Sequence, residues 1–332
     1  MEKIAESTGI DVSKETIDAH IHFKNQHKVF PNNNKGFKEL IQWMKKATGM
    51  ELKQIIICFE HTGLYSLPLA TFLSKQTIDF CMVPGLEIKK SMGVTRGKND
   101  KVDALRIAEY AYLRREKLEM YTLPSENLLN LQNLLVLRER MVSQRSGYCA
   151  NLNESKKMLE KKGNELHFKT QEQVIEQLSK HIEKLEEAIK DIIKNDEQMN
   201  KHFTLITSIK GIGLVLAVNL LLTTNCFSKF DDARQYACYA GIAPFGYQSG
   251  TSIHSKSKVS HFANKKMKSL LHLSALSAIT CDSELKQYYH KRVDEGKSKM
   301  STINIIRNKI IYRVFAVVKR GTPYVPLYKH AA

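Results

Sequence analysis

The segment Ile55–Phe59 (IIICF) constrains the fold most, because five consecutive apolar residues lead directly into a carboxylate, Glu60. A run of this kind is typical of a strand that is covered on both faces. The periodicity around it predicts alternating strands and helices, the pattern of a mixed α/β sheet flanked by helices. The predicted strands cover 4–12, 17–23, the residues near 29–30 and 80–83, and the predicted helices cover 35–46, 65–75 and 100–115.

Beyond Pro124 the pattern becomes helical throughout. Residues 126–202 contain no proline, and their positive and negative charges balance. Part of this region has apolar residues at alternating steps of three and four, the a/d pattern of a coiled coil. They are Ile175, Leu178, Ile182, Leu185, Ile189 and Ile192. The pattern suits a helical spacer or dimerisation arm, and it equally suits one long helix that packs on its own domain.

The remaining residues, 203–332, are predicted to be mostly α-helical, with a loop at 241–260 and helices at about 265–280 and 302–319. We therefore expect three parts: an α/β domain at 1–125, a helical coiled-coil arm at 126–202 and a C-terminal domain at 203–332.

Net charge gives the first indication of a partner. The chain carries a formal charge of +17, and residues 203–332 contain 19 Lys and Arg against 6 Asp and Glu, a local excess of +13. Such a concentration attracts a polyanion through counterion release, which favours nucleic acid over solubility alone as its explanation.

Other features bound the location of the protein. The six cysteines form no CxxC pair, which argues against zinc or a disulfide framework and for a reducing compartment. No apolar stretch reaches eighteen residues, and the first residues lack the pattern of a signal peptide. We expect a cytoplasmic, nucleoid-associated bacterial protein without a membrane span.

Four acids of the first domain stand at informative places. Asp11 lies within the first predicted strand, Glu60 follows the buried strand, and Asp100 and Asp103 share one face at the start of a helix. Carboxylates at strand ends are rigidly placed, and several of them can hold Mg²⁺ for phosphodiester cleavage. This order of acids predicts an RNase-H-like metal nuclease core.

Each acid also has a structural explanation. Asp100 can cap the helix, with Asp103 favoured there by the helix dipole, and Glu60 can begin a turn. Asp11 is harder to explain in this way, because an acid within an apolar strand is costly to bury unpaired.

The C-terminal region offers a candidate nucleophile. Ser249 precedes a basic run, and its hydroxyl can attack a phosphodiester and hold the strand as a phosphoserine ester. From the residues alone, a turn is the better explanation of Ser249-Gly250, and Tyr247 is an equally eligible nucleophile. The basic residues expected to bind nucleic acid here are Lys256, Lys258, Lys265 and Lys266.

A second candidate contact with nucleic acid is Lys210-Gly211-Ile212-Gly213, which resembles the turn of a helix-hairpin-helix. Gly211 and Gly213 would let backbone N–H groups approach a phosphate at a helix N-terminus, and Lys210 is expected to bind nucleic acid beside them. A tight turn between two helices explains the same residues.

Taken together, five motifs resemble those of the DEDD insertion-sequence transposases, the IS-one-ten family, which includes Piv-like invertases and bridge-RNA-guided recombinases. The resemblance covers nearly the whole chain, in order and in spacing. The motifs are Gly9-Ile10-Asp11-Val12-Ser13-Lys14, Glu60-His61-Thr62-Gly63-Leu64-Tyr65, Lys98-Asn99-Asp100-Lys101-Val102-Asp103-Ala104, Ser208-Ile209-Lys210-Gly211-Ile212-Gly213, and Ala240-Gly241-Ile242-Ala243-Pro244 continuing to Ser249-Gly250.

The resemblance implies a RuvC-like N-terminal domain in which Asp11, Glu60, Asp100 and Asp103 hold Mg²⁺. It also implies that Ser249 forms a covalent DNA intermediate. Members of the family join the halves of their sites from different subunits through a coiled coil, in a tetramer, and read donor and target DNA through a guide RNA encoded by the element. A dimer or tetramer, DNA and a guide RNA are therefore the expected partners.

The chain departs from the family at one point. Members commonly carry Ser-Lys-x-Gly after the serine, whereas this chain reads Ser260-His261-Phe262-Ala263-Asn264, so that a titratable group replaces a fixed cation.

Two other functions compete with a recombinase. A RuvC-like structure-specific nuclease needs the same acids but no serine, and a nucleic-acid-binding protein without activity needs neither.

Overall fold

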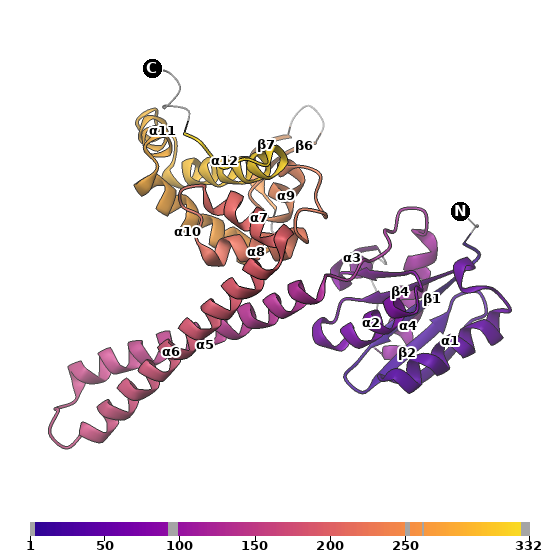
Figure 1. Cartoon of the computed structure of the whole chain (residues 1–332). Helices are drawn as coiled ribbons and strands as arrows, with labels where there is room; N and C mark the ends of the chain where they lie inside the picture. The colour runs from indigo at the N-terminus through magenta and orange to yellow at the C-terminus, as the bar shows by residue number, and fades with distance from the viewer. Residues whose placement is uncertain (1–3, 92–98, 250–252, 261, 327–332) are drawn as a thin grey trace. The chain divides into compact units, whose positions relative to one another are not determined.

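A computed structural model of the chain describes residues 4–91, 99–249, 253–260 and 262–326 (Figure 1). Contacts divide the chain into two compact units, 1–123 and 124–332, and the positions of these units relative to one another are not determined. Within the described residues, no helix combines the length and the apolar character needed to span a membrane.

The N-terminal unit is built on a five-stranded mixed sheet with the strand order β3-β2-β1-β4-β5. The pairs β1–β2 and β2–β3 are antiparallel, and β1–β4 and β4–β5 are parallel. The strands are β1 (Glu6–Val12), β2 (Thr16–Ile21), β3 (Gln26–Pro31), β4 (Ile55–Glu60) and β5 (Phe80–Val83). The expected mixed sheet is confirmed, and Ile55–Phe59 is indeed buried in its interior.

Helices cover both faces of this sheet. One face packs against α1 and α2 through an apolar core that includes Phe37 and Leu73, and the other packs against α3 and α4 through Ile88 and Ile107. The helices are α1 (Asn34–Thr48), α2 (Leu67–Lys75), α3 (Gly85–Ser91) and α4 (Asp100–Leu113). Successive side chains of a strand face opposite sides, so the acids of β1 and β4 lie on the face covered by α4.

The arm of the C-terminal unit is a long helical pair, α5 (Glu126–Met158) and α6 (Glu165–Asn195), which lie side by side (Figure 1). Ion pairs join the two helices, Arg138 to Glu186 at 2.6 Å and Lys156 to Glu172 at 2.7 Å. The apolar seam of α6 is only partly buried, with Ile182 and Ile189 inaccessible and its other members half-buried. The seam thus packs within the chain, and assembly through the arm stays a prediction.

The rest of this unit is mostly helical, and its core also takes in the base of the arm through Leu131 and Ile189. The helices are α7 (Glu197–Thr207), α8 (Leu214–Thr224), α9 (Ala233–Tyr239), α10 (Lys265–Cys281), α11 (Ser283–Asp294) and α12 (Lys299–Arg320).

One expectation for this region was wrong. The predicted loop at 241–260 contains an antiparallel hairpin, β6 (Pro244–Ser249) and β7 (Ile253–Val259). Its strands escape recognition because an exposed two-stranded hairpin needs no apolar face, so the residues show little of the alternation that marks a half-buried strand.

Candidate active site

The sheet places Asp11 and Glu60 side by side. In the parallel pair β1–β4, Ile10 lies opposite Phe59, so each acid is the next residue along its own strand. Asp11 also lies opposite Asp18 in the antiparallel pair β1–β2, which adds a fifth acid that the sequence analysis missed. Asp18 is itself hydrogen-bonded to His27, at 2.8 Å. The pairing of three strands therefore fixes the backbone positions of Asp11, Glu60 and Asp18.

Helix α4 brings the other two acids to the same face. Gly9 of β1 allows the close approach, because a Cβ there would lie 2.1 Å from the backbone nitrogen of Ala108. The hydroxyl of Ser7 then donates to the carbonyl of Ala108 at 2.7 Å and joins the helix to the strand. Asp100 and Asp103 occupy the first turn of α4.

The cap of α4 settles one alternative. Asn99, not Asp100, is the N-cap residue, and its side chain accepts a hydrogen bond from the backbone N–H of Lys101. The suggestion that Asp100 caps the helix is therefore wrong. Both acids still interact favourably with the helix dipole, but the dipole does not require either of them when the cap is already filled.

The electrostatics of Asp11 show that the acids are gathered. Burial raises the pKa of Asp11 from 3.8 to about 6, and the negative charges of Asp100, Asp103, Glu60 and Asp18 add to the effect in that order. A partly buried carboxylate among four others is stabilised either by a proton or by a cation. All four acids identified from the sequence thus belong to one electrostatic cluster.

The donor set of this cluster suits a hard divalent cation, because carboxylate oxygens are the ligands that Mg²⁺ prefers. The acidic side chains do not form a closed metal site in this structure. No three His, Cys, Asp or Glu of the described residues are grouped closely enough to hold an ion. Asp103 is turned toward Arg106, whose guanidinium donates to it at 3.0 Å. Its carboxylate must leave this ion pair to take part in coordination.

Gly85 at the start of α3 leaves room for the carboxylate of Glu60. A Cβ at this position would lie 1.9 Å from Glu60 Oε1. The sequence signal for its role is the position of this glycine, which follows Pro84 just after β5, the strand that pairs Val83 with Glu60.

The candidate nucleophile Ser249 is the last residue of β6 and lies opposite Ile253 of β7. Tyr247, the competing nucleophile, lies on the same strand opposite Ser255. The side chains of 247–249 and 253–257, Lys256 among them, lie outside the described part of the structure, as do Gly250 and His261. The choice between the two hydroxyls thus remains as the sequence left it.

The basic residues beside the hairpin fall into two groups. Lys258 is exposed on β7. Lys265 and Lys266 are exposed in the first turn of α10, where the helix dipole disfavours cations, so their placement does not serve the stability of the helix. Lys266 is paired with Glu139 of α5 at 2.7 Å, which leaves Lys265 as the more available of the two.

The turn between α7 and α8 has an architectural role. Gly211 has φ +93°, and a Cβ there would lie 2.8 Å from the carbonyl oxygen of Ser274 on α10, so packing alone requires a glycine. Gly213 has open space around it and is the N-cap residue of α8, without a side-chain cap bond. Lys210 is exposed beside it. Gly211 is therefore explained by packing, whereas Lys210 and Gly213 remain suited to a phosphate contact.

Two family models match the chain. A model of DEDD transposases of the IS110 type, described as "Transposase", matches residues 8–164, and a model described as "Transposase IS116/IS110/IS902 family" matches residues 203–290. Together they cover well over half of the chain and include both candidate regions.

Relatives agree with these matches. A pilin gene-inverting protein of Moraxella bovis is 29% identical over 323 residues, 95% of this chain and 96% of that protein, and a protein of the same name from Moraxella lacunata is similar to the same extent. An insertion element IS110 protein of Streptomyces coelicolor is 32% identical over 119 residues, 36% of this chain and 29% of that protein. The resemblance seen in the five motifs is thereby confirmed, and the chain belongs to the IS110 family of transposases.

Proposed function

We propose that this transposase cuts and rejoins DNA with Ser249 as nucleophile and with Mg²⁺ held by Asp11, Glu60, Asp100 and Asp103. The observation that carries the proposal is the electrostatic cluster around Asp11, which gathers these acids on one face of the sheet. Membership of a transposase family supports DNA as the substrate.

The N-terminal fold supports the metal half of the proposal. We assign it as RNase-H-like (RuvC-like), because a mixed sheet carries acids at the ends of neighbouring parallel strands and on the helix that covers them. Bound Mg²⁺ would polarise the phosphate and stabilise the leaving oxygen. The ends of β1 and β4 hold Asp11 and Glu60 in place. Arg106 forms an ion pair with Asp103 while no metal is bound.

The serine half follows from the chemistry of rejoining. The Ser249 oxygen attacks the phosphorus, a Ser–O–P bond forms, and the bond from phosphorus to one sugar oxygen breaks. The proton of the serine hydroxyl is lost to a base or solvent, and the departing sugar oxygen gains one. Attack by a second sugar hydroxyl reverses these changes and frees Ser249, so rejoining needs no external energy source.

The partners follow from charge and family. The basic C-terminal unit is proposed to bind donor and target DNA through Lys210, Gly211, Gly213, Lys256, Lys258, Lys265 and Lys266. The guide RNA, the three-part division at 125 and 202, the coiled-coil arm as the element that joins subunits, and action on the nucleoid in the cytoplasm are further parts of the same proposal.

A strand-exchange assay on element-end DNA tests the function. Ser249→Ala should abolish both recombination and the covalent protein–DNA adduct, whereas Tyr247→Phe, the matched loss of a neighbouring hydroxyl, should leave both intact. If Ser249→Ala still cleaves DNA without joining it, the protein is a RuvC-like nuclease and the serine half is wrong.

The guide RNA is tested separately. RNA that co-purifies with the protein should map to the flanks of its own gene. The absence of any specific RNA would remove the RNA-guided part of the proposal while leaving the recombinase part intact.

A further inference from the structure

Helices α10 and α12 of the C-terminal unit carry many cations and no acids. Helices α10 and α12 together contain nine Lys and Arg and not one Asp or Glu. A cation buried between these helices therefore needs a counter-charge from another element or from a ligand, because an isolated buried charge is strongly unfavourable.

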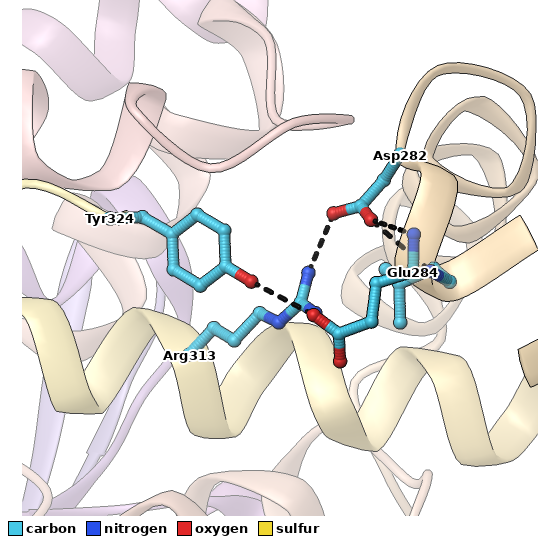
Figure 2. Close-up of polar contacts among 5 residues, drawn as sticks. Asp282, Glu284, Arg313 and Tyr324 are labelled. Carbon is cyan, nitrogen blue, oxygen red and sulfur yellow. Dashed lines mark hydrogen bonds and ion pairs between the residues drawn. The ribbon is translucent and has the colours of Figure 1, made fainter. Parts of the chain in front are cut away.

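Arg313 of α12 obtains its counter-charge from the start of α11. Its Nη1 donates to Asp282 and its Nη2 to Glu284, each at 2.8 Å, and its guanidinium lies 4.6 Å from the centre of the Tyr324 ring. Figure 2 shows both carboxylates around this one arginine and the Tyr324 hydroxyl directed at Glu284, to which it donates a hydrogen bond. Its charge is fully compensated within the chain.

Arg307, six residues earlier on α12, has no such partner among the described residues. Only 6% of its surface is exposed, yet no carboxylate of the described residues forms an ion pair with it. Its Nη2 donates to His272 Nδ1 on α10, and its Nε has no hydrogen-bond partner in the part of the chain that the structure describes. Burial lowers the pKa of Arg307 from its ordinary value, the mark of a cation that lacks an anion.

The partner of this guanidinium, His272, is partly exposed, and the segment of α12 that carries Arg307 also anchors the start of the hairpin that carries Ser249. His272 is half-buried, and Lys268 lies one turn before it on α10. Within one turn of Arg307, the amides of Asn304 and Asn308 donate to the carbonyl of Ile242, at 2.8 and 3.0 Å. Ile242 lies two residues before β6, so α12 anchors the start of the hairpin at the height of Arg307.

We propose that Arg307 and His272 form a phosphate-binding site that takes one backbone phosphate of the DNA substrate, a proposal that rests on the proposed function for the identity of that substrate. Arg307 supplies its unused N–H donors in the fork geometry that suits phosphate oxygens. Because His272 accepts at Nδ1, its Nε2 carries the proton and provides a further donor. Lys268, one turn before His272 on α10, adds positive charge nearby.

Thermal melting of the full-length protein without metal tests the site directly. Inorganic phosphate should raise the Tm of the wild type above its value in chloride at the same ionic strength. Arg307→Met should lose this phosphate increment and melt no lower than the wild type, because it breaks no ion pair. Lys319→Gln, which removes an exposed charge from the same helix, should keep the increment.

A purely structural role predicts the opposite. Arg307→Met would then melt well below the wild type in chloride and retain the wild-type response to phosphate, and that result would overturn the proposal. If Arg307→Met fails to fold, His272→Ala and Arg307→Lys serve instead. The first should reduce the phosphate increment and the second should keep only part of it, and an unchanged increment in both would equally overturn the proposal.

Binding of a short DNA duplex identifies the ligand. Arg307→Met should bind it about tenfold more weakly, with a salt dependence reduced by about one counterion, while Lys319→Gln matches the wild type. Weaker binding of RNA with unchanged binding of DNA would overturn the assignment to DNA. If the wild type and every variant fail to cleave DNA while the phosphate increment still depends on Arg307, the proposed function fails and the anion site stands.

Discussion

The two halves of the candidate machinery carry opposite charges. Around Asp11, two further acids lie on neighbouring strands of the five-stranded sheet and two lie on α4, where Asp103 forms an ion pair with Arg106. Around Arg307, a buried cation lies between helices without acids, on the helix that also anchors the start of the β6–β7 hairpin. The first region is suited to a cation and the second to a polyanion. The proposed reaction at a phosphate would use both.

The largest expected effect breaks the acidic side of this comparison. Glu60→Gln removes one charge from the cluster while keeping the size of the side chain, and DNA cleavage should fall about a thousandfold through loss of metal-assisted charge stabilisation. DNA binding should stay unchanged. Glu39→Gln, an exposed acid on α1, is the matched control and should be fully active. Equal activity of the two variants in a cleavage assay would remove Glu60 from the site.

Arg313 provides the comparison for the basic region. Its charge is balanced by two carboxylates, whereas Arg307 has no carboxylate partner among the described residues. Arg313→Met strands Asp282 and Glu284 without their cation and should lower the free energy of unfolding by about 3 kcal/mol. Arg292→Met breaks an exposed ion pair with Glu295 and a contact with Tyr288, and should cost much less stability than Arg313→Met. Denaturant unfolding of both variants makes the comparison. A similar small cost for both would mean that the Arg313 cluster is not a buried ion pair in solution.

Gly85 tests how closely the position of Glu60 matters. Gly85→Ala places a Cβ where Glu60 Oε1 now lies, so the carboxylate must move, and cleavage should fall about tenfold. The fold should survive, since only the end of one side chain has to shift. Gly147→Ala on α5, where the added carbon meets nothing within 4 Å, is the control for cleavage and for Tm. Unchanged cleavage in Gly85→Ala would show that the position of Glu60 is not limiting.

The smallest effect concerns stability and pH. The pKa of Asp11 is about 6 in the folded protein, above its ordinary value of 3.8, so the folded state favours the neutral acid. Ionisation therefore destabilises the metal-free protein as the pH rises from about 4 through 6. Asp11→Asn should avoid this loss and be more stable at pH 7, by about 1 kcal/mol after allowance for solvent screening. A Tm series over pH measures it. A wild type whose Tm stays parallel to that of Asp11→Asn would contradict the shifted pKa.

The acidic region could be predicted from sequence because the features that mark it involve residues close together in the chain. A strand that ends at Glu60, an acid within the first strand and two acids on one helical turn are all visible in the order of residues. What the sequence did not show were Asp18 and Gly85, since both depend on which strands pair and how closely α3 approaches. The seam of α6 was visible, but its partner within the chain, α5, followed only from the structure.

The basic region was harder to predict, for physical reasons. The sequence of β6 and β7 shows little of the apolar alternation that marks a strand, and Gly211 looked like a phosphate-binding residue although packing on α10 already explains it. Arg307 is an ordinary helical residue in the sequence. Only the burial of its side chain and the lack of a carboxylate beside it, among the described residues, distinguish it from Arg313.

The most direct test of the account is to trap the protein on its DNA and identify the modified residue by peptide mass spectrometry. With Mg²⁺ present, the adduct should map to Ser249 in the wild type and be absent in Glu60→Gln, because the proposed function requires the acids and the serine to act on the same phosphate. An adduct on Tyr247, an adduct that forms equally well in Glu60→Gln, or cleavage without any adduct would contradict the account.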